Sequence, residues 1–376
     1  MRCLFVVPSL NRAGAETQVV ALVNGMAARG HEVHLLTFES LLPLAERLDE
    51  RVRHHAAMRR YKFDFSYTRE IARIIDEFRI EVVHTTLQFA LLAAWLGRLR
   101  SRSRPPLVAS LHTTISRNTK EEWQNRLLYR HLLRRCARVI FVSANQRDYW
   151  LERYPGLGNH SVVIHNGVAV ERFRKQDFEE AGRRLREKHG IPEDAVVFSC
   201  IAAFRPEKGH HLLLAAFDRL ERDAWLLLAG DGESRPEIGN LAARSRKAER
   251  ILFLGQVADT RPVIAASQAT VLSSVAVETF SMAMLESMAL EVPMIAPAIG
   301  GLPEAIEPGH SGWLFPVGDG EGLAMAMRGI ADDPKQAQRM GEAARQTVAE
   351  RFSESGMIER TAQLLQEVVE DNASVG

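Results

Sequence analysis

Residues 273–290, with the sequence SSVAVETFSMAMLESMAL, decide how the rest of the chain is interpreted. They follow the apolar run 269–272, which predicts a buried strand. Ser281 is a good helix N-cap, because its hydroxyl can accept a hydrogen bond from the first helical turn. The Met, Ala and Leu residues after it favour helix. The pattern predicts a strand, a loop carrying Glu278, and a helix carrying Glu286 on its second turn.

This arrangement suits a nucleotide. A helix N-terminus offers unpaired amides and the positive end of the helix dipole, so it binds phosphate. Glu286 lies five residues beyond the cap, roughly 7.5 Å along the helix axis, which is about the reach from a diphosphate to its ribose. A carboxylate can accept both hydroxyls of a ribose diol. Glu278 precedes the cap, where it would hold hydroxyls of a sugar attached to the phosphates.

The two glutamates, with Thr279, Phe280 and Ser281 between them, resemble the EX7E element of the retaining glycosyltransferases of family 4. The usual element has Gly where Thr279 and Ser281 stand. Ser281 keeps the cap, whereas Thr279 costs backbone freedom. Glutamates at this spacing are common on solvated helix faces, and the cap between them makes the pattern specific. The Gly-Leu-Pro-Glu turn at residues 301–304 adds to that specificity.

Length and composition limit the possible classes. A chain of 376 residues with 46% hydrophobic residues suggests two domains. No apolar run reaches the ~18 residues that a membrane span needs. Residues 3–7 form a strand-like run followed at once by polar residues, which is not the pattern of a signal peptide. Cys3, Cys136 and Cys200 are far apart in sequence, so we expect reduced buried thiols in a cytoplasmic protein.

The charges are distributed unevenly. Residues 1–168 hold 25 Lys and Arg against 15 Asp and Glu, whereas the remaining residues hold 23 against 32. A basic half suits an anionic membrane surface or an anionic acceptor. Two domains of opposite charge that complement each other are the alternative. The basic side chains of the first half gather in residues 44–63 (Arg47, Arg51, Arg53, Arg59, Arg60, Lys62), 98–104 (Arg98, Arg100, Arg102, Arg104) and 125–138.

Residues 125–138, NRLLYRHLLRRCAR, predict a basic amphipathic helix. Its stripe of leucines comprises Leu127, Leu128, Leu132 and Leu133, and the arginines largely off that stripe are Arg126, Arg130, Arg134 and Arg135. Such helices can lie on anionic membranes, although most are solvated faces over a core. Nucleic acid is not expected as a partner, because few aromatic residues are interleaved with the basic ones.

The first half begins as a doubly wound sheet. Residues 3–7 predict a strand and a helix follows up to residue 29, with Gly30 as its C-cap. Residues 32–38 predict the next strand, which completes a βαβ unit. The chain has no GxGxxG dinucleotide fingerprint here. The loop around Gly14 resembles the glycine-containing loop of family 4, which lies near the donor phosphates and the acceptor; a plain tight turn is the alternative.

His112 follows a predicted strand at residues 107–110, which comes after another at 82–85. Ligands of α/β sheets bind at strand ends, and a neutral imidazole can both donate and accept. The resemblance assigns His112 to the hydroxyls or the developing charge of the donor sugar. A structural role is the alternative. A further strand is predicted at 139–143, residues 162–168 resemble the PNGV element of family 4, and the Asn166-Gly167 turn ends the first domain.

Lys208 lies between a strand predicted at 195–202 and a helix predicted at 210–220, where it can neutralise phosphate. Family 4 usually carries an Arg at the place of Ala203, and Arg205 is expected to substitute for it. Strands are predicted at 225–229, 251–255 and 293–296. In the family, the loop that holds Val257 meets the base through its backbone.

The resemblance therefore implies an α/β protein with the GT-B fold, in which two Rossmann-like doubly wound domains face each other across a cleft. The acceptor-side domain spans residues 1–168 and the nucleotide-sugar domain residues 169–352. Residues 353–376 form a helix that crosses back to the first domain. The implied nucleotide-sugar-binding residues are Gly14, Arg205, Lys208, Val257, Glu278, Thr279, Phe280, Ser281, Met282 and Glu286.

The implied activity is that of a retaining hexosyltransferase. A sugar moves from a nucleoside diphosphate sugar, expected to be a UDP-sugar, to a hydroxyl of a lipid-linked, glycolipid or polysaccharide acceptor. Lys208, Arg205 and the amides of residues 280–282 would hold the leaving phosphate, with His112 and Glu278 at the donor sugar. No carboxylate is placed in a position that argues for double displacement. The resemblance to family 4 implies front-face substitution instead. The chain has no Asp-x-Asp, so no metal or other cofactor is expected.

Two other classes of function stay open. One is a nucleotide-sugar epimerase or hydrolase on the same fold, which needs no acceptor. The other is a catalytically silent homologue that binds lipid or a partner protein, since Ala203, Thr279 and Ser281 depart from the family pattern. The expected location is the cytoplasm, with peripheral contact to the inner face of the cytoplasmic membrane through the basic domain.

Overall fold

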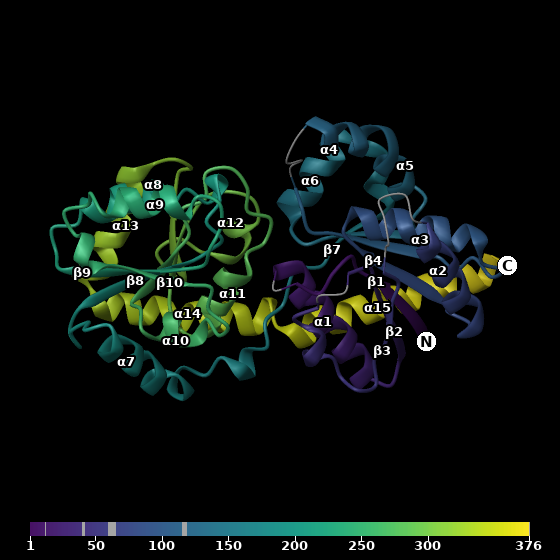
Figure 1. The fold of residues 1–376 in the computed structure, drawn as a ribbon, viewed down its shortest axis with the longest axis horizontal. Helices are drawn as coiled ribbons and strands as arrows, with labels where there is room; N and C mark the ends of the chain where they lie inside the picture. Colours follow the sequence, from purple (N-terminus) through teal and green to yellow (C-terminus); the bar gives the residue numbers. More distant parts are fainter. Residues whose placement is uncertain (12, 40–41, 59–64, 115–118, 376) are drawn as a thin grey trace. The chain divides into compact units, whose positions relative to one another are not determined.

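The computed structural model describes residues 1–11, 13–39, 42–58, 65–114 and 119–375, with backbone alone for 119–121 and 375. The chain divides into two compact units (Figure 1). Unit 1 comprises Met1–Gly167 and Glu354–Gly376, and unit 2 comprises Val168–Ser353. Each unit is built on its own sheet.

The sheet of unit 1 has the strand order β3-β2-β1-β4-β5-β6-β7, and all its neighbours are parallel. Its strands are β1 (Arg2–Val6), β2 (Glu32–Thr37), β3 (Arg53–Ala56), β4 (Val82–Thr86), β5 (Leu107–Leu111), β6 (Arg138–Phe141) and β7 (Ser161–Val163). The strand order reverses between β1 and β4. Loops that leave the carboxyl ends of these two strands diverge, which is where doubly wound sheets bind ligands.

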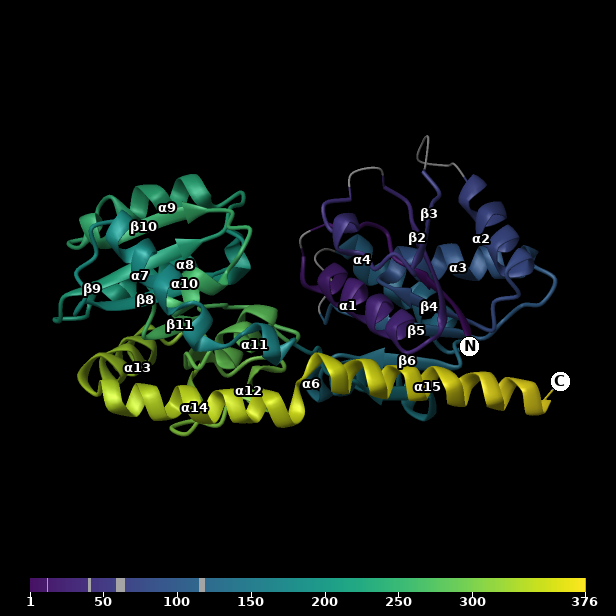
Figure 2. The same ribbon diagram turned by 90° about the horizontal axis from the view of Figure 1, so that it is seen from below.

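Helices cover both faces of this sheet. They are α1 (Gly14–Ala28), α2 (Ser66–Glu77), α3 (Gln88–Arg100), α4 (Thr119–Gln124), α5 (Arg130–Leu133), α6 (Ala144–Arg153) and α15 (Glu354–Val375). Successive residues of β1 point to opposite faces, as the strand period requires. Cys3 and Phe5 pack with residues of α1 and α15, whereas Leu4 and Val6 pack with residues of α2 and α3. Figure 2 shows α15 running alongside the rest of unit 1.

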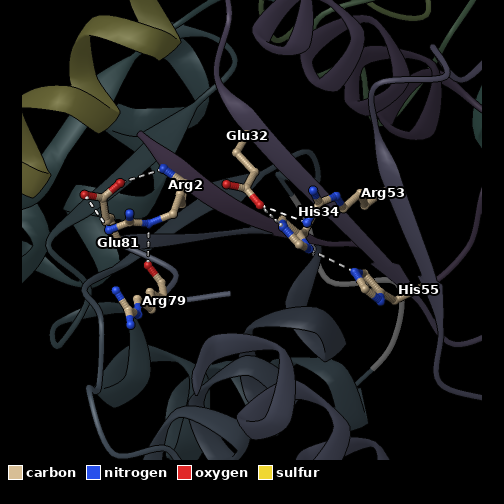
Figure 3. Close-up of polar contacts among 7 residues, drawn as sticks. All are labelled: Arg2, Glu32, His34, Arg53, His55, Arg79 and Glu81. Carbon is tan, nitrogen blue, oxygen red and sulfur yellow. Dashed lines mark hydrogen bonds and ion pairs between the residues drawn. The ribbon is translucent and has the colours of Figure 1, made fainter. Parts of the chain in front are cut away.

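Charged side chains at the amino ends of these strands pair with one another (Figure 3). Arg2 opens β1 and forms an ion pair with Glu81 at 3.2 Å. Glu32 opens β2 and accepts from Arg53, the first residue of β3, at 3.0 Å. All four side chains are partly exposed, and such pairs contribute little to stability. These charged side chains at the amino ends of the strands are therefore paired with one another.

Next to this end of the sheet, His34 and His55 form a chain of hydrogen bonds with Glu32 (Figure 3). His34 is completely buried; its Nε2 lies 3.3 Å from a Glu32 carboxylate oxygen and its Nδ1 lies 3.0 Å from His55 Nε2. Burial lowers the pKa of both imidazoles, to about 4 for His55, so both are neutral at pH 7. His34 therefore donates to Glu32 and accepts from His55.

Unit 2 contains a parallel sheet with the strand order β10-β9-β8-β11-β12-β13. Its strands are β8 (Val196–Ile201), β9 (Ala224–Ala229), β10 (Ile251–Gly255), β11 (Ala269–Val271), β12 (Met294–Pro297) and β13 (Gly312–Phe315). Its helices are α7 (Glu179–Lys188), α8 (His210–Asp218), α9 (Arg235–Ala242), α10 (Arg261–Ala265), α11 (Met282–Ala289), α12 (Leu302–Ala305), α13 (Gly320–Asp332) and α14 (Pro334–Arg351). The order reverses between β8 and β11.

The strands of unit 2 again divide their side chains between two faces. Phe198 and Cys200 of β8 pack in one core cluster with residues of α8, α13 and α14. Val197 lies between these two residues and points to the opposite face, where it packs in a second cluster with residues of β9 and α10. The three cysteines of the chain are buried free thiols, as predicted, and burial raises the pKa of each to about 12.

The prediction of one amphipathic helix over residues 125–138 is wrong. Asn125–Tyr129 is a π-helical segment, α5 ends at Leu133, and β6 begins at Arg138. Leu132 and Leu133 are buried, whereas Leu127 and Leu128 are 62% and 38% exposed. A π turn holds one residue more than an α turn, so it rotates the later leucines away from the earlier ones.

Two further differences concern the basic segments. Residues 53–56, expected only to be part of a basic stretch, form the edge strand β3. Arg59, Arg60 and Lys62 of the same stretch lie outside the described residues.

In the described part of the chain, none of the helices combines the length and apolar character that crossing a bilayer requires.

Candidate active site

Unit 2 brings Lys208 and Glu278 together at the point where its strand order reverses. Lys208 ends a short 3-10 turn, Pro206–Lys208, in the loop after β8. Glu278 lies in the loop after β11, the neighbouring strand. The Lys208 ammonium is 2.5 Å from a Glu278 carboxylate oxygen, and the Glu278 side chain is only 7% exposed. Two residues 70 positions apart in the chain thus form one largely buried ion pair, in which Lys208 is 23% exposed.

The two loops are joined by backbone contacts as well. Ser273 donates its hydroxyl to the Lys208 carbonyl at 2.9 Å, and the Val275 amide donates to the Glu207 carbonyl at 2.9 Å. Gly209 has φ +61°, and a Cβ there would lie 2.1 Å from the Ser273 carbonyl oxygen. A glycine is therefore required for this approach. Together these contacts hold Lys208 beside the end of β11.

Glu278 has a second partner. Ser274, only 1% exposed, donates its hydroxyl to the same Glu278 oxygen that Lys208 contacts, at 2.5 Å. A carboxylate buried to this extent needs such charge-assisted partners. The result is an ammonium, which suits a phosphate, next to an oriented carboxylate, which suits sugar hydroxyls.

A tight turn supports Glu278 from the backbone side. The Gly301 amide donates to the carbonyls of Glu278 and Thr279 at 3.3 and 3.0 Å. Gly300 has φ +58°, and a Cβ there would lie 1.5 Å from the Glu278 carbonyl oxygen. The position of Glu278 therefore depends on the absence of a side chain at Gly300.

The strand, cap and helix predicted around residues 269–290 are confirmed. β11 is buried, Ser281 accepts from the Met284 amide at 3.3 Å, and α11 begins at Met282. The Phe280 side chain is 5% exposed and packs on Phe352 with ring centroids 5.2 Å apart. The predicted phosphate-facing backbone of residues 280–282 thus lies at a helix N-terminus.

Glu286 lies on α11 and is half-buried. It accepts a hydrogen bond from the Thr260 hydroxyl at 2.8 Å. Val257, three residues before Thr260, is partly buried and packs in the core cluster between β9 and α10. The loop after β10 therefore lies against α11, which the sequence pattern did not predict.

The remaining sequence-predicted residue of unit 2 is Arg205. Its side chain is 48% exposed, and its closest charged partner is Glu207 at 4.0 Å. Arg205 shares a loop with Lys208, but the contacts do not bring its guanidinium to Glu278. Its substitution for the family arginine remains a prediction.

Gly14 and His112, the candidate residues of unit 1, follow strands of that unit's sheet. Gly14 is exposed and is the first residue of α1, reached by the loop after β1. His112 directly follows β5 and is half-buried. Burial lowers the pKa of its imidazole to about 4, so His112 is neutral at pH 7. A neutral ring has one donor and one acceptor nitrogen.

His112 lines a small cavity of about 30 Å³ together with His84, Ser110 and Thr361. His84 Nε2 is 2.8 Å from the Ser110 hydroxyl, and in the described part of the chain its buried Nδ1 has no hydrogen-bond partner. Burial lowers the pKa of His84 to about 3. The cavity has room for about one water molecule. The signal for His84 in the sequence was a titratable residue directly after the two valines of the predicted strand at 82–85.

The described residues contain no group of three or more His, Cys, Asp or Glu side chains that could hold a metal ion. In unit 2, the positive charge near the end of β11 comes from Lys208.

Two family models match adjoining parts of the chain. Residues 12–172 match the model described as Glycosyltransferase Family 4, and residues 182–347 match Glycosyl transferases group 1. The chain belongs to the family 4 glycosyltransferases. The division between the two models falls near the start of unit 2.

Among curated relatives, this glycosyltransferase is 26% identical over 359 residues to N-acetyl-alpha-D-glucosaminyl L-malate synthase of Bacillus anthracis, with 92% of each chain covered. Among solved structures, it resembles a glycosyltransferase of Rickettsia africae ESF-5 with a TM-score of 0.85 and 23% identity, covering 98% of both chains. It resembles Anabaena Alr3699/HepE in complex with UDP with a TM-score of 0.83 and 20% identity, covering 98% of this chain and all of the other. These structures establish the two-domain GT-B fold.

The support from Gly300 can be tested by substitution. We expect Gly300→Ala to lower transfer activity at least tenfold, because the new Cβ displaces the Glu278 backbone. Gly318 also has a positive φ, +79°, but has no atom within 4 Å of a Cβ built on it. Gly318→Ala therefore carries a similar backbone cost of about 1 kcal/mol without the clash and should keep most activity. Equal activity of the two variants would contradict the proposed support.

The buried His84 predicts a pH dependence of stability. Because folding lowers its pKa from 6.5 to about 3, its contribution is complete above pH 6.5 and is lost as the pH falls toward 3. The free energy of unfolding of the wild type should fall relative to His84→Gln by up to about 1.4 kcal/mol per pH unit below about pH 6. Denaturant unfolding between pH 7.5 and 5 measures this, with His310→Gln, at an exposed turn, as control. Parallel pH profiles of wild type and His84→Gln would exclude the effect.

Proposed function

We propose that this glycosyltransferase moves a hexosyl group from a UDP-sugar to an acceptor hydroxyl with retention of anomeric configuration. The observation that carries the proposal is the ion pair of Lys208 and Glu278, in which an ammonium suited to phosphate lies beside a carboxylate suited to sugar hydroxyls. The relative from B. anthracis is named as an N-acetyl-alpha-D-glucosaminyl L-malate synthase, and a solved structure of Anabaena HepE is in complex with UDP-glucose. Both favour a nucleotide-sugar donor.

The donor diphosphate would lie at the N-terminus of α11. Backbone amides of Phe280, Ser281 and Met282 and the Lys208 ammonium would hold it, because each presents positive charge to the oxygen on which negative charge builds up. Exposed Arg205 would join them once a diphosphate is bound. These groups would supply the charge that a cation supplies in metal-dependent transferases.

Glu278 would orient the donor sugar by accepting its hydroxyls. We do not assign Glu278 the role of nucleophile, because Lys208 and Ser274 both contact one of its oxygens. In front-face substitution, the acceptor oxygen bonds to the anomeric carbon as the bond from that carbon to the phosphate oxygen breaks. The acceptor proton passes to the leaving phosphate on the same face. The sugar therefore keeps its configuration without a covalent enzyme intermediate.

The remaining roles follow from charge and position. Neutral His112 would hydrogen-bond a donor-sugar hydroxyl, since its lowered pKa keeps it uncharged at pH 7. Glu286 would accept the ribose hydroxyls, and the backbone near Val257 would meet the base. Gly14, at the start of α1, would allow close approach of the donor and acceptor to the backbone.

Two substitutions test this assignment. Lys208→Ala should weaken UDP binding at least tenfold and abolish transfer, because the leaving phosphate loses its cation. Glu278→Ala should abolish transfer of the sugar. Calorimetry with UDP and a product assay over several nucleotide sugars measure the two effects.

Lys188→Ala removes the same charge from an exposed position on α7 and controls for net charge. Thermal unfolding of each variant checks that it is folded. Full activity of folded Lys208→Ala or Glu278→Ala would refute the proposed roles. Release of free sugar or of an isomerised donor by the wild type without acceptor would instead indicate a hydrolase or an epimerase.

We further propose that the acceptor is lipid-linked or a glycolipid or polysaccharide intermediate, and that unit 1 meets it at an anionic membrane surface. Trp123 and Leu127 lie one helical turn apart and are 55% and 62% exposed. The Arg126 guanidinium lies 6.0 Å from the Trp123 ring centroid, and Arg134 is exposed nearby in the chain. Apolar side chains flanked by arginines fit the boundary between lipid head groups and acyl chains.

Vesicle pelleting tests the membrane proposal. The protein should bind vesicles of phosphatidylglycerol and phosphatidylcholine (1:1) more than vesicles of phosphatidylcholine alone, and less at high salt. Leu127→Ser should reduce this binding several-fold, whereas Leu241→Ser, at a leucine 40% exposed on α9 of unit 2, should not. Equal binding of both variants would place the membrane contact elsewhere or exclude it.

A further inference from the structure

Thr260 uses its hydroxyl in an unusual way for its position. It is the residue before α10, where a threonine hydroxyl ordinarily accepts from the amides of the first helical turn. Here it makes no such capping bond. Instead it donates to Glu286 Oε2 on α11, 26 residues away in the chain, at 2.8 Å. A hydroxyl available for a local cap is thus directed at a carboxylate of the candidate site.

The neighbours of Thr260 hold it in place. The Asp259 carboxylate accepts from the Arg261 amide at 3.0 Å and from its guanidinium at 2.8 and 2.9 Å. The Arg261 guanidinium also donates to the Arg172 carbonyl at 3.3 Å and lies 4.5 Å from the centroid of the Phe178 ring. The turn that carries Thr260 is therefore fixed by the bidentate ion pair between its two neighbours and by the cation–π contact of Arg261.

This contact matters because Glu286 is only half-buried. A glutamate side chain loses rotamer entropy when it is ordered. The bond from Thr260 orders the carboxylate before a ligand arrives. A carboxylate has about four lone-pair sites, so a carboxylate can accept from a threonine hydroxyl and from both hydroxyls of a ribose at once.

Thr260 also connects two parts of the nucleoside site. It belongs to the same loop after β10 as Val257, whose backbone is expected to meet the base. Glu286, on α11, is expected to meet the ribose. A movement of the loop would therefore change the position of the ribose-binding carboxylate.

We propose that Thr260 is a positioning residue that holds Glu286 for recognition of a ribose diol, and so makes the site select ribonucleotides over 2′-deoxyribonucleotides. The proposal rests on the proposed function, which places the donor nucleotide at α11. It adds a residue outside the EX7E element to donor recognition.

Calorimetry with UDP and 2′-deoxy-UDP tests the proposal, with Thr260→Val and Thr260→Ser as variants. Valine has the shape of threonine without the donor, and serine keeps the hydroxyl. The wild type should prefer UDP by tenfold or more. Thr260→Val should lose about five- to tenfold in UDP affinity and no more than about twofold in 2′-deoxy-UDP affinity, and Thr260→Ser should stay within about twofold of the wild type for both.

Steady-state kinetics separates positioning from a general structural effect. Thr260→Val should raise KM for the donor and leave kcat within about twofold of the wild type. A wild-type ratio of UDP to 2′-deoxy-UDP affinity in Thr260→Val would overturn the proposal, as would equal losses in Thr260→Val and Thr260→Ser. A wild type that binds neither UDP nor 2′-deoxy-UDP, nor GDP and its 2′-deoxy form, would refute the proposed function itself.

Discussion

The ion pair between Lys208 and Glu278 is the constraint on which the candidate site depends. A carboxylate with only 7% of its side chain exposed is costly unless it is paired and hydrogen-bonded. Because its partners come from the loops after β8 and β11, those strands must be neighbours, and the reversal of strand order makes them so. Gly209 is needed because it lets the loop after β8 approach the Ser273 carbonyl closely. Gly300 is needed because it lets the loop after β12 approach the Glu278 carbonyl closely. The fold of unit 2 is therefore tied to the position of one charged pair.

This pair also bears on how a nucleotide sugar would bind. A phosphate that draws the Lys208 ammonium toward itself weakens its contact with Glu278, and a buried carboxylate without its cation is destabilising. Hydroxyls of a sugar on the same phosphate can donate to Glu278 and compensate. A diphosphate alone offers no such donors. The arrangement therefore favours the intact donor, because its two ends satisfy the cation and the carboxylate together.

The parts of the site that the sequence predicts are those set by neighbouring residues. The strand at β11, the Ser281 cap and the α11 helix follow from local pattern, and Lys208 follows from its place between a strand and a helix. The contacts of Ser274 with Glu278 and of Thr260 with Glu286 depend on how loops pack, and local preference misleads for Thr260, which would otherwise cap α10. The prediction of one leucine stripe over residues 125–138 was wrong because the π-helical segment changes the rotation between successive leucines. No single residue type in that segment indicates a π-helix.

The ends of the two sheets show why ligand chemistry gathers at the carboxyl ends of strands. At the amino ends in unit 1, Arg2 pairs with Glu81 and Glu32 pairs with Arg53, in solvent-exposed contacts worth little individually. At the carboxyl ends in unit 2, charge is buried and helix N-termini point toward the loops. The energy of an exposed ion pair changes little when a ligand replaces one partner, because water already screens both charges. A buried pair changes strongly in energy with each added donor or acceptor, so selectivity for a ligand can arise there.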